Sequence, residues 1–460
     1  MTTYSDFLGK KTWDAVDSGF IAENINPMMY PFQQACVKWA CKRGKAALFE
    51  DTGLGKTVQE AEFARLVHDH TRGDVLILAP LCVAQQTVGE AEKFGIDVNY
   101  CRNASQLRAG VNITNYEMIE HFESAEFAGI VLDESSILKS QTSKIRQYIT
   151  DRFQTTPYRL SCTATPSPND YMELGNQSEF LGIMKASEML SMFFTHDGGE
   201  TSKWRLKGHG KQRFWEWLAT WAICIKKPSD IGFDDANYNL PPLNIIDHVV
   251  ESSSSFDDLL PGVATTLTER RQAKKESMRE RIKLAADIAN NSDEGFIIWC
   301  HLNDESTALS ESIPDAVEVT GSMSPGAKEK NIISFTVGES RAIVSKPSIA
   351  GFGMNWQHCR NQIFAGINDS WEEFYQAIRR SYRFGQHHEV NIHVITSSAE
   401  AAVLENIRRK QEQADDMSAQ MIEHMKSIMQ HEIHGASIEK TEYKPHQTME
   451  IPEWLISEAA

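Results

Sequence analysis

A glycine-rich segment restricts the fold of this chain more than any other feature: Glu50-Asp51-Thr52-Gly53-Leu54-Gly55-Lys56-Thr57. A short apolar run at 46–49 precedes it, and an amphipathic helical pattern follows from Val58 to about Val67. A Gly-x-Gly-Lys-Thr string between a strand and a helix is typical of a phosphate-binding loop. Glycines let backbone N–H groups approach phosphates, and the helix N-terminus adds a positive dipole. We therefore expect phosphate groups to contact Thr52, Gly53, Leu54, Gly55, Lys56 and Thr57.

The loop departs from the usual pattern at one position, because Glu50 stands where a first glycine is common. The simpler alternative is an ordinary glycine-rich turn with a solvated lysine. If the loop binds phosphates, Lys56 reaches the outer ones and the Thr57 hydroxyl binds Mg²⁺. This chemistry implies ATP and Mg²⁺ as cofactors.

Apolar runs without polar alternation recur along the chain in two groups. The first group lies at 46–49, 75–78, 129–132 and 159–161, and the second at 296–299, 317–319, 342–344, 362–364 and 392–395. Such runs, separated by helical patterns, indicate parallel sheets covered by helices on both faces. Polar residues directly follow several runs, at the sheet edge where open α/β sheets place their ligands. We predict an α/β fold with two lobes of this kind.

The 460 residues are enough for about two to three domains. We predict an N-terminal extension at 1–29, a first lobe at 30–182, a helical insertion at 183–242 that is rich in basic and aromatic residues, a second lobe at 243–400, and a C-terminal helix and tail at 401–460. The helical pattern of the last segment extends to about His434.

Composition argues against several classes of protein. No run of about 18 apolar residues occurs, so we expect no membrane span. The N-terminus lacks an apolar signal core, which argues against export. The eight cysteines form no Cys-x-x-Cys pair, and we expect them to be reduced in the cytoplasm. The net charge of −17 argues against nonspecific coating of DNA, although contacts confined to one groove stay compatible with it.

An acidic pair, Asp133-Glu134, directly follows the apolar run at 129–132. An acid at this position can hold Mg²⁺, and a neighbouring glutamate can orient and deprotonate an attacking water. In isolation such a pair is usually a helix N-cap. Its position about 80 residues after the glycine-rich loop favours a catalytic role.

Three arginines lie close together near the end of the second lobe: Arg379, Arg380 and Arg383. Arg380 and Arg383 are three residues apart, so they share a face if the segment is helical. Two neighbouring guanidinium groups suit the γ-phosphate of an ATP that the other lobe holds. The alternative for the segment alone is a solvated basic helix face.

Basic residues gather in two stretches, at 203–227 and at 269–283. Basic and aromatic residues together can hold phosphates and pack on bases. Trp217 and Trp221 are four residues apart, however, and fit one apolar helix face better than a stacking surface. We expect nucleic-acid phosphates to contact Lys207, Lys211, Arg213, Arg270, Arg271, Lys274 and Lys275.

Taken together, these segments resemble the superfamily 2 helicases, and most of all the Swi/Snf-type translocases. The resemblance extends from about Pro31 to Lys410, with the motifs in the family's order. In the first lobe it rests on Pro31-Phe32-Gln33 as the adenine-recognising Q motif, the loop at 50–57, motif Ia at 79–86, motif Ib at 113–118, Asp133-Glu134-Ser135-Ser136 as motif II, and motif III at 161–166. In the second it rests on motif V at 348–355 and motif VI at 376–386.

The resemblance implies two RecA-like lobes with ATP between them, Gln33 on the adenine, Gly353 in the nucleotide site, and Arg380 and Arg383 as arginine fingers. Lys56, Asp133 and Glu134 complete the implied catalytic set. It further implies a monomeric motor on double-stranded DNA, of a size found in phage or bacterial genomes, working in the cytoplasm or in that of a host.

The chain departs from the family at Ser136, where many relatives carry the histidine that links motif II to the second lobe, and at Thr87, where a tryptophan is common. No strand-separating hairpin is legible. Two alternatives stay open: a helicase that separates DNA or RNA strands, and an ATP-dependent binding switch without motor output.

Overall fold

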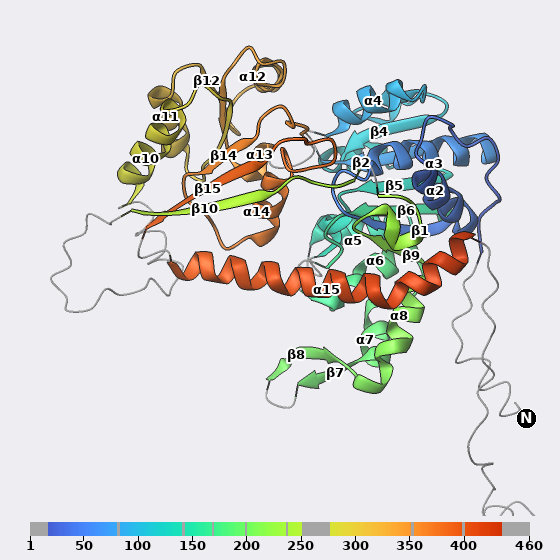
Figure 1. Ribbon diagram of the computed structural model, residues 1–460. Helices are drawn as coiled ribbons and strands as arrows, with labels where there is room; N and C mark the ends of the chain where they lie inside the picture. Colours follow the sequence, from blue (N-terminus) through green and yellow to red (C-terminus); the bar gives the residue numbers. More distant parts are fainter. Residues whose placement is uncertain are drawn as a thin grey trace, which may run out of the picture.

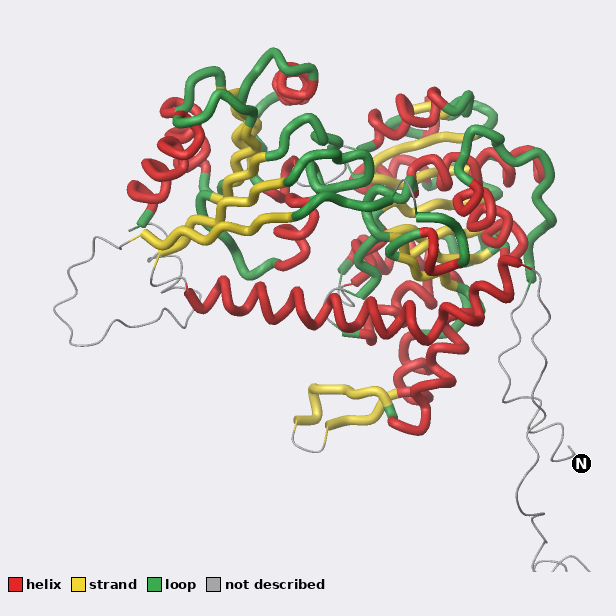
Figure 2. Tube along the Cα trace, viewed as in Figure 1, coloured by secondary structure: helices red, strands yellow, loops and turns green. Residues whose placement is uncertain are grey.

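A computed structural model describes residues 17–434, with gaps at 81–82, 140–142, 168–169, 198–199, 236–237, 251–276, 351–353 and 398–400. Two α/β lobes lie side by side, and one long helix crosses beneath both (Figure 1). Figure 2 shows the strands of each lobe gathered in the middle with helices around them. No helix among the described residues has the length and apolar character needed to cross a membrane.

Lobe 1 is built on a seven-stranded parallel sheet of order β3-β4-β2-β5-β6-β1-β9. Its strands are β1 (Lys45–Glu50), β2 (Val75–Ala79), β3 (Val98–Tyr100), β4 (Val111–Asn115), β5 (Gly129–Asp133), β6 (Tyr158–Thr163) and β9 (Ala222–Ile225). Its α-helices are α2 (Pro31–Arg43), α3 (Lys56–Thr71), α4 (Ala84–Lys93), α5 (Lys144–Arg152), α6 (Leu174–Leu181), α7 (Ala186–Phe193) and α8 (Lys211–Ala219).

Lobe 2 repeats this plan with a six-stranded parallel sheet of order β10-β15-β14-β11-β13-β12. Its strands are β10 (Leu243–Val250), β11 (Phe296–Trp299), β12 (Ala316–Val319), β13 (Ala342–Ser345), β14 (Asn361–Phe364) and β15 (Val390–Ser397). Its helices are α10 (Met278–Asn290), α11 (Asn303–Ser312), α12 (Pro325–Thr336), α13 (Pro347–Ala350) and α14 (Trp371–Ile378), followed by α15 (Ala401–His434). Side chains from the two faces of this sheet lie in different hydrophobic clusters, with Ile297 in one and Ile298 in the other.

The predicted α/β architecture is confirmed, and each predicted apolar run is a strand. The segment at 183–242 is less helical than predicted. It contains an antiparallel hairpin of β7 (Phe194–Asp197) and β8 (Glu200–Leu206). It also contains β9, which pairs with β1 at the edge of the lobe 1 sheet. Four-residue apolar runs such as β9 cannot be told from helix by periodicity.

The part of the N-terminal segment that the structure describes packs on lobe 1. The amides of Ser18 and Phe20 donate to the carbonyls of Arg43 and Cys41, at 3.2 and 2.9 Å. Ala22 and Met29 are buried in the lobe 1 core. From residue 17 onward, this segment is therefore part of the lobe surface.

Helix α15 contributes buried side chains to the cores of both lobes. Near its start, Val403 and Ile407 belong to a lobe 2 cluster. Farther along, Met421, Met425 and Met429 belong to the lobe 1 cluster, and their spacing of four places them on one face. At about 1.5 Å per residue, its 34 residues extend far enough to connect the lobes.

We predict that Arg281→Ala destabilises lobe 2 by about 3–5 kcal/mol, because it leaves a buried carboxylate without its cation. Arg281 and Glu305 are fully buried and their charged groups are 2.7 Å apart, which ties α10 to α11. Urea unfolding of the full chain measures the loss, with the exposed Lys283 on the same helix as a Lys283→Ala control. Equal unfolding midpoints for the two variants would contradict the prediction.

Candidate active site

The glycine-rich loop connects β1 to α3 on lobe 1. Gly53 and Gly55 have φ angles of +90° and +83°, which residues other than glycine rarely adopt. A Cβ atom on Gly55 would lie 2.3 Å from Gln33 Nε2. Lys56 Nζ donates to the carbonyls of Glu50 and Asp51 at 2.7 and 3.2 Å. The loop therefore curls around the lysine in the strand–loop–helix context that a phosphate site requires.

Glu50 is tolerated in place of the usual glycine because its backbone belongs to β1, where no positive φ is needed. Its side chain is fully buried behind the loop, and Oε2 accepts a hydrogen bond from Gln59 Nε2 at 2.7 Å. Burial raises the pKa of this carboxyl to about 7, against the lowering influence of Lys56.

Two carboxyl groups lie next to each other at the end of β5: the buried Asp133 is the last residue of the strand, and the half-buried Glu134 directly follows it. Burial, and then the neighbouring Glu134, raise the pKa of Asp133 to about 7, while Lys56 opposes the shift. Burial also raises the pKa of Glu134. Glu134 has a φ of +53°, a conformation that costs a non-glycine residue about 1–3 kcal/mol and is found mainly at functional sites. Crowded acids of this kind fit a divalent cation, which would offset their mutual repulsion.

Lobe 2 contributes the three arginines to the same place. A cleft is lined from both lobes by Thr52, Gly53, Gly55, Lys56, Thr57, Val83, Gln86, Thr87, Glu90, Asp133, Glu134, Arg379, Arg380 and Arg383. The assumption of a helical arginine face is wrong, because α14 ends at Ile378 and the arginines lie in the turns that follow. The turns still bring Arg380 and Arg383 to the cleft.

The arginines differ in how their charge is balanced. Arg379 forms an ion pair with Asp51 of the loop at 3.0 Å. The guanidinium of Arg380 instead donates to the backbone carbonyl and the side-chain oxygen of Gln376, at 2.8 and 3.0 Å. It also donates to the Met354 carbonyl at 3.2 Å. Among the described residues, Arg383 Nε has no hydrogen-bond acceptor. Burial, together with Arg383, lowers the pKa of Arg380 to about 9, so this wall of the cleft favours an anion.

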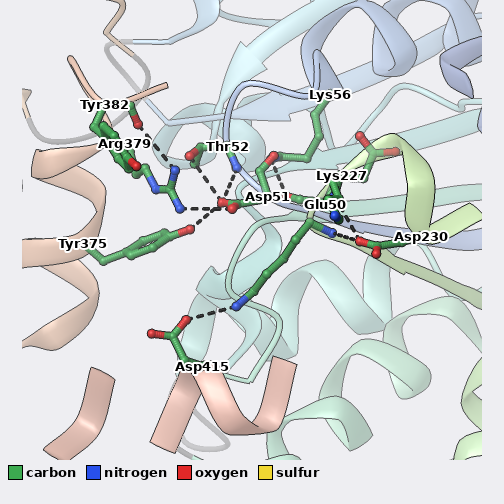
Figure 3. Close-up of polar contacts among 11 residues, drawn as sticks. Glu50, Asp51, Thr52, Lys56, Lys227, Asp230, Tyr375, Arg379, Tyr382 and Asp415 are labelled. Carbon is green, nitrogen blue, oxygen red and sulfur yellow. Dashed lines mark hydrogen bonds and ion pairs between the residues drawn. The ribbon is translucent and has the colours of Figure 1, made fainter. Parts of the chain in front are cut away.

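Asp51 forms a contact between the lobes, with Arg379 and Tyr375, that the sequence did not predict (Figure 3). Its carboxylate accepts from Arg379 of lobe 2 at 3.0 Å and from the Tyr375 hydroxyl at 2.5 Å. Arg379 and Tyr375 together hold the pKa of Asp51 below its usual value in spite of burial.

A second contact between the lobes starts one turn earlier on α14, at Glu372. Its carboxylate pairs with Lys139, just after motif II, and accepts from Thr165 Oγ1 in motif III at 3.4 Å. Within the part of the chain that the structure describes, the buried Gln376 Nε2 on the same helix has no hydrogen-bond partner. Glu372 therefore joins motif II to lobe 2.

Some predicted residues lie away from the cleft or outside the described residues. Gln33 Nε2 donates to the carbonyl of Leu54 at 2.8 Å and its Oε1 accepts from the amide of Tyr30 at 3.0 Å. Gln33 thus contacts the loop through the Leu54 carbonyl, and neither residue is part of the described lining of the cleft. An adenine contact for Gln33 stays a prediction. Gly353 falls outside the described residues. Gln86 and Glu90 line the cleft from α4.

The predicted nucleic-acid residues are only partly described. Lys211 and Arg213 are exposed in the first turn of α8. Lys207 Nζ donates to the carbonyls of Ser191 and Met192 at 2.8 and 3.1 Å. Arg270, Arg271, Lys274 and Lys275 lie outside the described residues. The neighbouring Trp215, Trp217 and Trp221 are buried in the lobe 1 core, as the apolar alternative predicted.

Comparison with known proteins assigns both lobes. Residues 32–197 match the SNF2-related domain, and residues 276–385 match the helicase conserved C-terminal domain. Over 430 residues the chain is 20% identical to the DNA annealing helicase and endonuclease ZRANB3 of Mus musculus, and over 426 residues it is 19% identical to the Homo sapiens protein. Each match covers 82% of this chain but 39% of the relative, so the chain spans about two fifths of these relatives' length.

Among solved structures, the Sulfolobus solfataricus SWI2/SNF2 ATPase core in complex with dsDNA matches with 18% identity and a TM-score of 0.41, covering 92% of this chain and 99% of that one.

The buried Glu50 carboxyl predicts a pH dependence of stability. Its pKa is about 7 in the folded chain and about 4.3 when unfolded, so stability falls as pH rises from about 4.3 to about 7. Glu50→Gln mimics the protonated form and lacks this loss. We expect the variant to be more stable than wild type at pH 8, by up to about 3 kcal/mol, with the difference disappearing near pH 4.5. Urea titrations across this pH range measure the difference in the free energy of unfolding between the variant and wild type. A difference that does not change with pH would refute the raised pKa of Glu50.

Proposed function

Because this chain belongs to the Swi/Snf-type superfamily 2 helicases, we propose that it is an ATP-driven motor that translocates on double-stranded DNA. One observation carries the proposal. Lys56, Asp133 and Glu134 of lobe 1 face Arg380 and Arg383 of lobe 2 across a single cleft. Phosphoryl transfer needs positioning and charge stabilisation above all, and this cleft supplies cations from both sides.

We assign a role in ATP hydrolysis to each of the predicted catalytic residues of the cleft. Lys56 and the backbone amides of the loop hold the β- and γ-phosphates. Mg²⁺, when bound, neutralises phosphate charge, and Asp133 and Thr57 are the oxygen donors suited to hold it. Glu134 orients the attacking water and accepts its proton. Arg380 and Arg383 stabilise the charge that develops on the γ-phosphate.

Hydrolysis drives movement because the site is divided between two lobes. A nucleotide whose phosphates are held by Lys56 attracts the two arginines and so draws the lobes together, and loss of phosphate removes this attraction. Small changes in the separation of the lobes then shift their contacts along the DNA backbone. We assign backbone contacts to Lys207, Lys211 and Arg213, and also to Arg270, Arg271, Lys274 and Lys275, as parts of one groove that offsets the acidic net charge locally.

Strand separation is a second candidate, and one observation favours it. The β7–β8 hairpin projects from lobe 1 on the same subdomain as α8 (Figure 1). A projecting hairpin next to exposed basic residues can act as a wedge between strands. The two functions differ in product, since only the second converts a duplex into single strands.

For the chemistry, we predict that Lys56→Ala and Glu134→Gln each abolish ATP turnover, and that only Lys56→Ala strongly weakens nucleotide binding. Lys56 contacts phosphates, whereas Glu134 acts on water. Phosphate release and titration with a fluorescent ATP analogue separate the two effects. Glu92→Gln, an exposed acid on α4, is the matched control. Near-normal turnover in Glu134→Gln would remove Glu134 from the mechanism.

For the substrate, we predict that double-stranded DNA stimulates ATP hydrolysis more than single-stranded DNA or RNA does. Lys211→Ala combined with Arg213→Ala weakens duplex binding for all sequences and flattens the salt dependence by roughly one unit of slope per lost phosphate contact. Lys93→Ala, at an exposed position, controls for general loss of charge. Stimulation by RNA alone would refute the DNA assignment, and an unchanged salt slope would refute the contact residues.

A further inference from the structure

The carboxylate of Asp51 is the point at which the phosphate loop is attached to the helix that precedes the arginine fingers (Figure 3). Its Oδ2 accepts from Arg379 at 3.0 Å. Its Oδ1 accepts from the Tyr375 hydroxyl at 2.5 Å and from the Thr52 amide at 2.7 Å. The side chains of Asp51 and Arg379 are 14% and 13% exposed, so solvent screens their attraction far less than that of a surface pair.

Both partners are held rigidly within their own lobes. The Asp51 amide donates to the carbonyl of Ile225 in β9 at 3.0 Å, so the lobe 1 sheet fixes the backbone of the loop. The Arg379 guanidinium lies over the rings of Tyr375 and Tyr382, at 5.0 and 5.4 Å from their centroids. Little freedom remains for either charge, and the ion pair therefore sets the distance between the loop and the end of α14.

Arg379 directly precedes the first finger. It is the C-terminal cap of α14, and the amide of Arg380 donates to the carbonyl of Ala377 at 3.1 Å in the turn that follows. Anchoring Arg379 thus positions Arg380, and through the next turn Arg383. Of the three arginines, Asp51 pairs only with Arg379, so the charges of Arg380 and Arg383 stay available to phosphate.

We propose that Asp51 is a positioning residue for ATP hydrolysis, which through Arg379 and Tyr375 holds Arg380 and Arg383 in register with the phosphate loop. The proposal rests on the proposed ATPase function and adds to it the means by which the loop and the fingers are aligned. The alternative role for this ion pair is an autoinhibitory contact that keeps the empty site closed. Loss of an autoinhibitory contact raises the basal rate of hydrolysis, whereas loss of a positioning contact lowers the rate of the chemical step.

The test compares Asp51→Asn, Arg379→Gln and the double variant in the full chain, with ATP and duplex DNA. Each single variant lowers kcat roughly 10- to 100-fold, as misalignment of reacting groups does, while the Kd for nucleotide stays within about threefold. The double variant is no slower than the slower single variant, because both changes break the same contact. Tyr375→Phe, which removes one of the two donors, gives a smaller loss.

Glu373→Gln is the matched control, since it removes a carboxylate from the same helix one position beyond Glu372 and keeps wild-type kcat. Thermal unfolding verifies that each variant is folded, and a variant that fails to fold is replaced by Tyr375→Phe, whose reduced kcat at unchanged Kd supports the same conclusion. Wild-type kcat in the folded Asp51→Asn chain, a raised basal rate, or losses that multiply in the double variant would each overturn the proposal. A wild-type chain that hydrolyses no ATP would instead overturn the proposed function itself.

Discussion

The arrangement of the two lobes depends on the burial of one helix in both hydrophobic cores. Val403 and Ile407 anchor α15 in lobe 2, and Met421, Met425 and Met429 anchor it in lobe 1. Full burial of one such side chain contributes about 1.5–3 kcal/mol, so detaching α15 from either lobe is costly. Ion pairs of Arg408 with Asp247 and of Glu432 with Arg43 add to both attachments. The lobes are thus joined through this helix as well as through the contacts of Asp51 and Glu372.

Opposite charges face each other across that cleft. Lobe 1 presents the crowded acids Asp133 and Glu134 beside Lys56, and lobe 2 presents Arg380 and Arg383, for which the described residues form no ion pair. Burial makes each group costly to leave charged. A magnesium–triphosphate complex matches both sides, because its cation suits the acids and its phosphates suit the arginines.

Helix α14 connects the chemical parts of the site. Glu372 contacts Lys139 and Thr165, and Thr165 donates its amide to Thr163 Oγ1 at 3.1 Å. Thr163 Oγ1 in turn lies 3.5 Å from the Glu134 carboxylate. The end of the same helix reaches Asp51 through Arg379. One short helix of lobe 2 and the turn that ends it are therefore in contact with both the glycine-rich loop and the residues around Glu134.

The sequence alone determined the two α/β lobes, the glycine-rich loop and the strand ends that carry Asp133 and Glu134. Those features follow from local patterns: continuous apolar runs, glycines at positive φ, and polar residues directly after strands. The hairpin and β9 were missed because short apolar runs have no decisive period. Only the tertiary structure decided that Asp51 pairs with Arg379, 328 positions away, and that Lys139 pairs with Glu372, 233 positions away. A charged side chain shows no sequence period that identifies its partner, so such pairs become visible only when folding places the two lobes against each other.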